Sequence, residues 1–434
     1  MRAARTGGEG RRSDVKRLRT AVVGSGVAGL TAAYVLSRTH DVVLYEADTR
    51  LGGHAHTHDV KAPDGGTLRV DSGFIVHNGR TYPHLLRLFR ELGVSGQDSE
   101  MSMSVRCDGC GLEYAGARGP AGLFSGPGTL RTPYLRMLAE VPLFHRAARR
   151  VLRSGSRPDT YTLGRFLADG GFSAYFVAHF VGPLVSAVWS CPGETAMSYP
   201  ARYLFRFLDH HGLLSVSGSP RWRTVAGGSA TYVDRAAERL ADVRLGTPVR
   251  GVRRFSDRVR LVTADGDTEE FASVVVAVHP DQALRMLSDP TPEERDVLGA
   301  FRYSRNPAVL HTDTSMLPRS AGARASWNHH LPTCEASPDA VRISYDMNRL
   351  QRLPAGADFV VTLNDGGDVS PDHVLARMTY EHPVYTPTSL AAQRRLPALN
   401  TDRTAFAGAY HGWGFHEDGC RSGARAAAAL GVTW

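Results

Sequence analysis

Hydrophobic and polar positions follow different periods in different parts of the chain, and each period predicts a different kind of element. Residues 20–23 form an uncharged, mostly β-branched run, which is typical of a central parallel strand buried on both faces. Small and apolar residues over 30–37 then recur at helical spacing, and residues 42–45 form a second buried run. The globular body is therefore predicted to begin with a strand–helix–strand unit.

The rest of the chain divides by the same criterion. Residues 130–189 follow a mostly helical pattern rich in Leu, Phe and Tyr, and residues 290–396 alternate as β-strands do. Between these two parts, the pattern predicts a helix near 229–240 and short strands at 249–252, 259–263 and 271–278. The C-terminal end carries a predicted strand over 404–407 and then an Ala-rich helix.

These elements predict an α/β fold with two interleaved domains. The chain has 434 residues, of which 42% are hydrophobic, so it is long enough to build two cores. We expect a Rossmann-like nucleotide-binding domain and an α+β substrate-binding domain behind a disordered basic tail. The expected bounds are 1–17 for the tail, 18–95, 221–289 and 397–434 for the nucleotide domain, and 96–220 and 290–396 for the substrate domain.

Charge and cysteine content restrict the function classes. The net charge is +8, and Lys16 and Lys61 are the only lysines, so the positive charge is almost wholly arginine. A genome-wide bias toward arginine explains this most simply, and a surface for anionic lipid or acidic substrates is the alternative. No basic stripe carries interleaved aromatic residues, so nucleic acid is not an expected partner. Five cysteines do not suggest a disulfide framework, which predicts a reducing, cytoplasmic location.

One segment, FSAYFVAHFVGPLVSAVW at 172–189, is apolar enough to be compared with a membrane span. Pro183 would break or kink a helix there, so we expect a helix that lines an internal apolar cavity. Shallow contact with a membrane surface stays open as an alternative, which would make the protein peripheral at that surface.

The turn after the first predicted strand carries the most specific motif, Gly24-Ser25-Gly26-Val27-Ala28-Gly29. Gly24 permits the tight turn, Gly26 lets a pyrophosphate approach the backbone, and Gly29 lets helix and strand pack closely. The helix N-terminus adds free N–H groups for the phosphates. Glu46 ends the second strand, directly before Ala47, where a carboxylate can accept hydrogen bonds from ribose hydroxyls. The combination predicts a dinucleotide site.

A second glycine doublet identifies the family. Six residues after Glu46 the chain reads GGHAHTHDV, and the loop VDSGFIVHN follows at 70–78. On these motifs the chain resembles the flavin amine oxidase and phytoene desaturase superfamily, which implies FAD as cofactor and a nucleotide domain of the glutathione-reductase-2 type. His54 stands where that family usually has Arg. The resemblance implies cofactor contacts at Gly52, Gly53, His54, Gly73, Phe74 and Val249.

Two groups of side chains have the composition of metal ligands. His54, His56 and His58 alternate, so an extended strand would place them on one face, but their position after the doublet favours a phosphate-side loop. Cys107-x-x-Cys110 is half of a zinc ribbon, and no second C-x-x-C exists in the chain. The Asp-Gly pair between these cysteines predicts a hairpin turn. We therefore expect no metal.

The phrase YHGWGFHEDGCRSG near the C-terminus completes the predicted site. With PRWRTVAGGS and YDMNRLQ, it resembles bacterial flavin oxidoreductases encoded beside cyclopropane-fatty-acyl-phospholipid synthases, and the flavin half of plant cyclopropane fatty acid synthases. The resemblance implies a second clamp on the flavin, with the backbone of Gly419 and Cys420 facing the flavin pyrimidine. Phe415, His416 and Glu417 are candidates for lining the flavin, with an acid–base role open for His416 or Glu417. The remaining expected cofactor contacts are Gly408, Gly414 and Asp418.

Three functions stay open from the sequence. The first is an FAD-dependent two-electron oxidation, of the desaturase or dehydrogenase type, of an apolar fatty-acyl or lipid substrate. The second is an amine oxidase with an atypical active site, because many amine oxidases of the superfamily hold a Lys near flavin N5 and neither Lys16 nor Lys61 is suitably placed. The third is a flavin-bound accessory subunit of a lipid-modifying enzyme, with a methyltransferase as partner.

Overall fold

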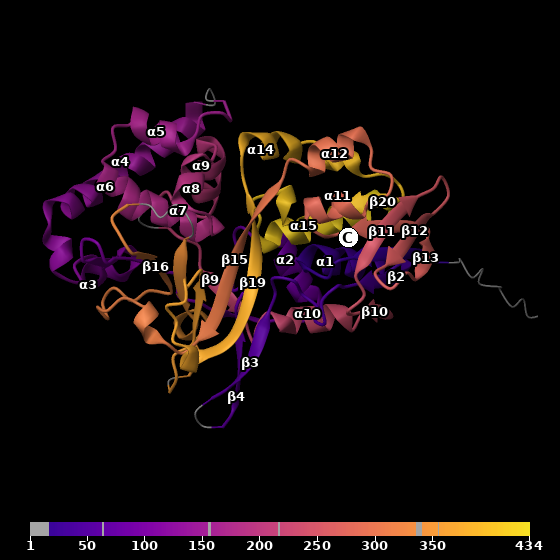
Figure 1. Cartoon of the computed structure of the whole chain (residues 1–434), viewed down its shortest axis with the longest axis horizontal. Helices are drawn as coiled ribbons and strands as arrows, with labels where there is room; N and C mark the ends of the chain where they lie inside the picture. Colours follow the sequence, from indigo (N-terminus) through magenta and orange to yellow (C-terminus); the bar gives the residue numbers. More distant parts are fainter. Residues whose placement is uncertain (1–16, 63–64, 155–157, 216–217, 336–340, 355) are drawn as a thin grey trace, which may run out of the picture.

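The computed structural model describes residues 17–62, 65–154, 158–215, 218–335, 341–354 and 356–434. The predicted basic tail lies outside the described residues, except for Arg17. Within the described part, a body built on a parallel sheet and a body built on a mixed sheet lie side by side, and a lobe of helices extends from the mixed sheet (Figure 1).

The predicted strand–helix–strand unit is present and belongs to a five-stranded parallel sheet of order β10-β2-β1-β14-β20. Along β1, Val22 packs into the core on one face, whereas Ala21 and Val23 pack into the core on the other. This alternation is the burial on both faces that the uncharged run predicted. The strands are β1 (Leu18–Val23), β2 (His40–Tyr45), β10 (Asp242–Arg244), β14 (Ser273–Val276) and β20 (Thr404–Phe406).

Helices from both ends of the chain cover one face of this sheet. The first helix, α1 (Val27–Leu36), packs closely against the last, α15 (His416–Ala429), and α2 (Pro83–Glu91) and α10 (Ala230–Ala237) complete the layer. A Cβ on Gly423 of α15 would overlap the Ala28 carbonyl oxygen, so a glycine is needed where the two helices meet. The N-terminus of α15 is thereby fixed beside the glycine turn of α1.

The opposite face is covered by an antiparallel sheet and short helices. The sheet consists of β11 (Val249–Arg254), β12 (Val259–Thr263) and β13 (Thr268–Phe271). The predicted single strand over 271–278 is wrong, because the chain turns at Ala272 from β13 into β14 of the parallel sheet. Three helices lie beyond: α11 (Pro280–Met286), α12 (Pro292–Leu298) and α14 (Pro387–Gln393). Val297, Leu298 and Ala392 belong to the core under this face, although the chain segment 290–396 was expected in the substrate domain.

The second body is built on a seven-stranded mixed sheet of order β19-β15-β18-β17-β16-β7-β8. Its pairs are antiparallel except for β16 and β7, which run parallel. The long strands β15 and β19 run beside the parallel-sheet body (Figure 1). The strands are β7 (Met103–Cys107), β8 (Leu112–Ala115), β15 (Arg302–His311), β16 (Trp327–Leu331), β17 (Arg342–Asp346), β18 (Val360–Leu363) and β19 (Val374–Val384).

A lobe of helices gathers at one end of the mixed sheet (Figure 1). The predicted cavity-lining segment consists of the short helix α6 (Ala174–Phe176), a π-helical turn η3 (Val177–Val181) and the helix α7 (Gly182–Trp189). Pro183 lies in the first turn of α7. No helix among the described residues is both long and apolar enough to cross a membrane. The helices are α3 (Gly119–Leu123), α4 (Thr132–Ser154), α5 (Leu163–Asp169), α6 (Ala174–Phe176), α7 (Gly182–Trp189), α8 (Gly193–Met197) and α9 (Ala201–His210).

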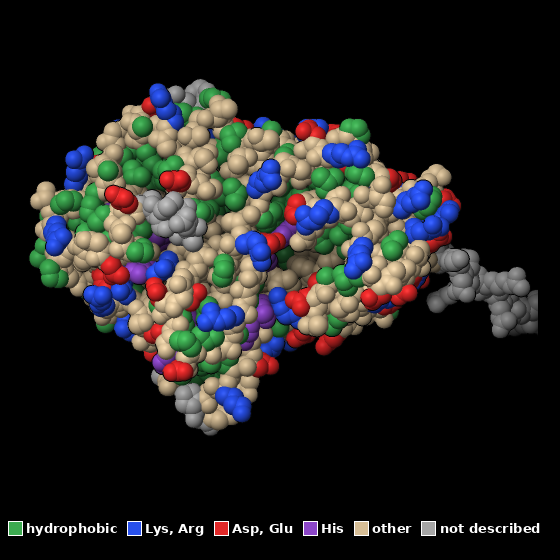
Figure 2. All heavy atoms as spheres, in the orientation of Figure 1, with side chains coloured by type: hydrophobic (Ala, Val, Ile, Leu, Met, Phe, Trp, Pro, Cys, Tyr) green, Lys and Arg blue, Asp and Glu red, His purple; other side chains and the backbone are tan. Residues whose placement is uncertain are grey.

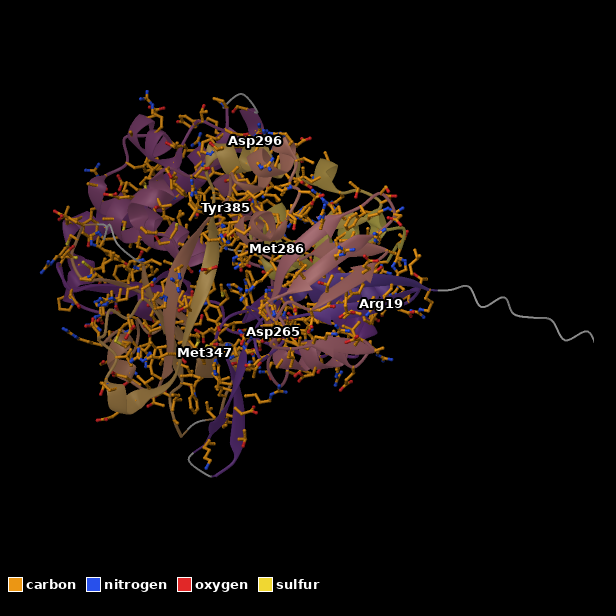
Figure 3. The ribbon with its side chains drawn as sticks, turned by 45° about the vertical axis from the view of Figure 1, so that its right-hand side comes forward. Arg19, Asp265, Met286, Asp296, Met347 and Tyr385 are labelled. Atoms are coloured by element: carbon orange, nitrogen blue, oxygen red, sulfur yellow. The ribbon has the colours of Figure 1, made fainter. Side chains whose placement is uncertain are left out.

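Short elements connect the two bodies. The hairpin of β3 (Thr57–Lys61) and β4 (Thr67–Asp71) projects from the molecule, and β5 (Val76–Asn78), β9 (Trp222–Val225) and β6 (Gly96–Asp98) form a small sheet (Figure 1). One further helix, α13 (Met347–Gln351), follows β17. Tyr385, which follows β19, lies at the centre of the molecule and its hydroxyl donates to the Gly412 carbonyl at 2.8 Å (Figure 3). Isolated 3₁₀ turns are η1 (Gly116–Arg118), η2 (Pro127–Leu130), η4 (Thr314–Met316), η5 (Pro371–His373), η6 (Leu396–Leu399) and η7 (Ala409–His411).

Candidate active site

One large cavity runs between the two bodies and into the helical lobe. Its volume is about 1510 Å³, which exceeds the ~300–1,000 Å³ typical of a single-ligand pocket. One end is lined by the turn after β1, and the other by apolar side chains of α4 and α7. Of the residues predicted to contact the cofactor, these line the cavity: Gly24, Ser25, Gly26, Val27, Ala28, Glu46, Ala47, Gly53, His54, Gly73, Phe74, Val249, Gly408, Gly414 and Phe415.

The three fingerprint glycines have three different reasons to be glycine. Gly24 has φ +97°, and a Cβ there would lie 2.6 Å from the Ala277 carbonyl oxygen. A Cβ on Gly29 would overlap the Gly24 carbonyl oxygen, so Gly29 sets the close packing of α1 on the turn. A Cβ on Gly26 would meet no atom within 4 Å and would project into open space at the cavity wall. That space is where a pyrophosphate would approach the helix N-terminus.

The Gly52-Gly53 doublet closes over the same turn. Gly52 forms a bridge with Gly26, and a Cβ on Gly53 would lie 3.2 Å from the Gly26 Cα. Both doublet residues have positive φ, at +105° and +56°. Arg50 holds this loop by donating to the Gly53 carbonyl at 2.8 Å. The prediction of a second glycine loop beside the first therefore matches the geometry.

Glu46 lies where the adenosine part of a dinucleotide would extend. Its carboxylate accepts hydrogen bonds from the backbone of Ser25 and Asp48, both at 2.9 Å, and faces the cavity. Val249 lines the same end, at the start of β11. The fixed carboxylate suits recognition of ribose hydroxyls.

His54 faces the cavity between two other rings. Its ring centroid lies 5.1 Å from that of Tyr380 and 5.5 Å from that of His382. Burial, and secondarily the neighbouring His382, holds the pKa of His54 well below its usual value, so the imidazole is neutral near pH 7. Within the described part, its Nε2 atom is buried without a hydrogen-bond partner. A neutral His54 therefore cannot supply the permanent positive charge of the usual Arg.

The other two histidines of the predicted trio have separate roles. The ring centroids of His56 and His58 lie 4.0 Å apart. The Tyr380 hydroxyl lies 3.2 Å from His56 Nδ1, and the Ser72 hydroxyl lies 2.8 Å from His58 Nε2. Of these three histidines, His54 alone lines the cavity. Among the described residues, this trio does not gather its ring nitrogens into a metal-binding group.

The C-terminal phrase divides at His416. Phe415 and His416 line the cavity, and the His416 ring stacks on Phe74 with a centroid distance of 3.7 Å. Burial lowers the pKa of His416 to about 3. The side chain of Glu417 leaves this cavity and accepts from the backbone N–H groups of His84 and Leu85 at the start of α2. Glu417 thus caps α2 and does not face the reacting centre.

The expected contacts of Asp418, Gly419 and Cys420 with the cofactor need correction. Asp418 caps its own helix, because its Oδ2 accepts from Trp413 and Phe415 N–H groups at 2.9 Å and 3.1 Å. A Cβ on Gly419 would lie 2.6 Å from the Val27 side chain, and Cys420 is fully buried in the core shared with α1. The Gly419 N–H already donates to the Phe415 carbonyl. By helix geometry, the amides free to face a ligand belong to the preceding turn, 416–418.

Several residues that line the cavity were not predicted as site residues. His279, after β14, stacks on Tyr303 at 3.9 Å, and its Nδ1 lies 3.1 Å from Glu381. His382 hydrogen-bonds Asn306 at 3.0 Å, and burial lowers its pKa to about 4. Purple histidine side chains are visible near the centre of the face shown in Figure 2. The signals available in the sequence were the strand end VVVAVHP and the phrase HPVYTP.

The cavity wall has the polar groups that a flavin dinucleotide needs. Four residues of the wall each carry a buried polar atom that has no hydrogen-bond partner among the described residues: His54 (Nε2), Trp327 (Nε1), Tyr410 (Oη) and Trp413 (Nε1). With the open space at Gly26 and the carboxylate of Glu46, the residues present fit FAD. When bound, FAD supplies the electron-accepting ring.

Comparison with known proteins agrees with this geometry. The profile of the family described as flavin containing amine oxidoreductase matches residues 27–311. The chain belongs to this family. The predicted resemblance to the flavin amine oxidase superfamily, with FAD as the cofactor, is confirmed.

Individual relatives are distant. The (S)-6-hydroxynicotine oxidase of Paenarthrobacter nicotinovorans is 26% identical over 283 residues, which are 63% of this chain and 63% of that protein. The chain thus matches less than two thirds of this relative's length. Among solved structures, cyclohexylamine oxidase from Brevibacterium oxydans has a TM-score of 0.67 at 17% identity, covering 95% of this chain and 98% of that one. A CLA-producing fatty acid isomerase from P. acnes has a TM-score of 0.65 at 15% identity, covering 94% and 97%. These two structures share the fold.

Proposed function

We propose that this flavoenzyme oxidises an apolar substrate of the fatty-acyl or lipid class by removing two electrons, as a desaturase or dehydrogenase does. The observation that supports this proposal is the part of the cavity inside the helical lobe. Most of its described wall consists of apolar and aromatic side chains, and the lobe also contributes two histidines, His145 and His211. The side chains from β7, β8, α3, α4, η3 and α7 that line this part include Val105, Tyr114, Leu123, Met137, Leu138, Val141, Pro142, His145, Phe180, Leu184, Ala187 and Val188. We call this set the apolar arm.

The charge distribution along the cavity favours a neutral substrate end in the arm. Burial lowers the pKa of His145 to about 4, so this residue is uncharged near neutral pH. The charged residues of the described cavity wall lie elsewhere, after β2, on β11, on α11 and on β19: Glu46, Asp48, Arg250, Arg285 and Glu381. A cationic amine in the arm would therefore find no carboxylate among the described wall residues, and burying an unpaired charge is costly.

The arm lies beneath an exposed apolar surface. Four large hydrophobic side chains between residues 124 and 143 are strongly exposed: Phe124 at 49%, Leu130 at 71%, Leu135 at 46% and Leu143 at 57%. On the face shown in Figure 2, green side chains gather over the helical lobe. Arginines such as Arg136 and Arg146 lie on the same helix, α4. We propose that this surface contacts an anionic membrane from which an acyl chain enters, because apolar side chains with basic neighbours suit such an interface.

Anaerobic titration tests the substrate class. The purified flavoprotein would be mixed with acyl substrates of increasing chain length, and loss of the oxidised flavin absorbance would be recorded. We expect reduction by acyl substrates and none by primary amines. Val141→Asp, inside the arm, should slow reduction at least tenfold, whereas Leu143→Asp, on the exposed side of the same helix, should not change the rate with a soluble substrate. Equal effects of the two substitutions would contradict the assignment of the arm.

Oxidation of an apolar amine is the second candidate function. The relationship to (S)-6-hydroxynicotine oxidase supports it, although the alignment covers only 63% of this chain. The absence of lysine from the described cavity wall argues for an atypical site, since Lys61 ends β3 on an exposed hairpin and Lys16 lies outside the described residues. Peroxide release with an amine panel, without reduction by acyl substrates, would select this alternative. Reduction by neither class would favour a flavin-bound accessory subunit of a lipid-modifying enzyme such as a methyltransferase.

A further inference from the structure

Four soft ligand groups converge at the edge of the mixed sheet, outside the flavin cavity. The side-chain ligand atoms of Cys107, Cys110, His179 and Cys334 all lie within 4.8 Å of one another. They come from three segments that are distant in sequence: the β7–β8 turn, the π-helical turn η3, and the residues after β16. No other group of this kind is present among the described residues.

Two of the distances between these atoms match those between ligands of one tetrahedral ion. The Cys107 and Cys334 sulfurs lie 3.8 Å apart, and the Cys110 sulfur lies 3.6 Å from His179 Nε2. With Zn–S of ~2.3 Å and Zn–N of ~2.0–2.1 Å, a tetrahedron places two sulfurs about 3.8 Å apart and a sulfur and a nitrogen about 3.6 Å apart. A disulfide would require about 2.05 Å between sulfurs.

The backbone of the β7–β8 turn is shaped for this convergence. Gly111, directly after Cys110, has φ +69°, which lets the chain reverse after the second cysteine. A Cβ on Gly109 would lie 2.9 Å from the Cys334 backbone nitrogen, so only glycine admits the third cysteine so close to the turn. The Asp108 N–H donates to the Leu331 carbonyl at 2.9 Å and fixes the turn to the end of β16.

Neighbouring groups orient His179 toward the sulfurs. Its Nδ1 lies 3.1 Å from the Tyr175 carbonyl oxygen, which leaves the Nε2 lone pair facing Cys110. The Tyr175 ring stacks on the imidazole at 4.0 Å, and the Tyr114 hydroxyl donates to the His179 carbonyl at 2.8 Å. A ring N–H bound to a carbonyl is the usual support of a metal-ligating histidine, and π-helical turns often occur at functional positions.

We propose that Cys107, Cys110, His179 and Cys334 bind one Zn²⁺ ion as a structural site. Three thiolates and one imidazole select zinc among common divalent ions, and four protein ligands leave no position for substrate. The ion would connect the helical lobe to β7 and β8, and two residues of the apolar arm adjoin His179: Phe180 follows it in sequence, and Tyr114 donates to its carbonyl. Arg131, which donates to the Cys110 carbonyl at 2.9 Å, partly offsets the net negative charge of the thiolate set.

The expectation of no metal rested on the missing second C-x-x-C. The fold supplies the other two ligands singly: His179 lies 69 residues after Cys110, and Cys334 lies 227 residues after Cys107. Neither spacing resembles a sequence motif for zinc. The hairpin predicted from Asp108-Gly109 is present, since β7 pairs antiparallel with β8, and the hairpin holds the first two ligands.

Metal analysis of the whole flavoprotein tests the proposal. The protein, purified without a histidine tag and dialysed against EDTA, should contain one zinc per chain by inductively coupled plasma mass spectrometry. After denaturation with chelator and without reductant, all five cysteines should react with a thiol reagent. The proposal would be overturned if the protein contained no zinc or contained iron instead. It would also be overturned if only three thiols reacted, because that result would reveal a disulfide.

Two cysteine variants provide the matched comparison. Cys334→Ser removes an exposed ligand and should release zinc at a chelator concentration at least tenfold lower than for the wild type. Cys191→Ser removes a buried cysteine outside the group and should retain zinc as the wild type does. The ratio of flavin to protein should be unchanged in both variants, which separates this test from the proposed function. Retention of zinc by Cys334→Ser equal to that of Cys191→Ser would refute the assigned ligand set.

Discussion

Replacing Gly26 with alanine would separate the cofactor role of the fingerprint from its folding role. Gly26 precedes α1 with φ −61° and ψ 174°, a conformation open to any residue. Its added Cβ would meet no protein atom within 4 Å. Lower unfolded-state entropy favours alanine by about 0.4–1 kcal/mol, whereas the N-cap preference for glycine over alanine opposes it. The stability of the cofactor-free protein should therefore change by less than about 1 kcal/mol.

FAD binding should respond differently, because the new methyl group would occupy the space through which the pyrophosphate approaches the helix N-terminus. A hydrogen bond to a charged group contributes ~1.5–3 kcal/mol, and each 1.4 kcal/mol corresponds to about a tenfold change in Kd. Loss of one or two such bonds should weaken FAD binding by about 10-fold to more than 1,000-fold.

The assay is titration of deflavinated protein with FAD, followed by quenching of flavin fluorescence, together with thermal unfolding of the cofactor-free form. Gly29→Ala is the matched control, since its Cβ would overlap the Gly24 carbonyl oxygen and should lower the unfolding temperature even without FAD. If Gly26→Ala binds FAD as tightly as the wild type does, the phosphates do not approach this turn. If Gly29→Ala unfolds like the wild type, the close packing of α1 is wrong.

Three further predictions concern the C-terminal clamp and its surroundings. Glu417→Ala should reduce stability by about 0.5–2 kcal/mol in denaturant unfolding, because α2 loses its cap, and should leave the flavin spectrum unchanged; a folded Glu417→Gln variant that cannot turn over would instead support an acid–base role. The pKa of His416 is lowered by burial to about 3, so the unfolded chain binds the extra proton between about pH 6.5 and 3. The contribution of this group to the unfolding free energy is therefore fully present above about pH 6.5, and it is lost on acidification by up to ~1.4 kcal/mol per pH unit. His416→Gln should reduce the slope of the unfolding free energy against pH by that amount. Tyr385→Phe should cost only about 0.5–1.5 kcal/mol, because Tyr203 and Gln393 still donate to the Gly412 carbonyl; a much larger loss in chemical denaturation would contradict this.

Local patterns predicted the nucleotide half of the fold because its determinants are local. The uncharged run 20–23, the glycine turn and Glu46 lie within one strand–helix–strand unit, and the structure has each element where it was expected. The strand predicted over 271–278 was wrong because β13 and β14 are consecutive in sequence but pair in different sheets. Hydrophobic periodicity identifies a strand, but it does not identify the partner strand.

Contacts at the second clamp required tertiary information. The resemblance identified the phrase at 414–420, but only the packing of α15 on α1 shows which of its residues face the cavity. Gly419 is needed because α15 packs closely on the Val27 side chain of α1. Glu417, in the first turn of α15, accepts a hydrogen bond from the backbone at the start of α2. His279, between β14 and α11, and His382, on β19, line the cavity, although neither was predicted as a site residue. Side-chain direction at a helix N-terminus depends on the neighbouring helix, which the sequence alone does not specify.

The proposed function implies a division of labour between the two ends of the cavity. An apolar arm can hold an acyl chain, since burial of each CH₂ group contributes about 0.8 kcal/mol, but sliding the chain by one carbon changes the free energy by no more than that amount. The arm therefore provides affinity and cannot by itself select which carbon meets the flavin. Hydrogen bonds between the substrate and polar wall residues outside the arm can do so, because leaving a buried polar group unpaired costs more, about 1–3 kcal/mol. His279, Glu381 and His382 are polar wall residues outside the arm, so substrate register should depend on residues of this kind, and chain-length preference on the arm.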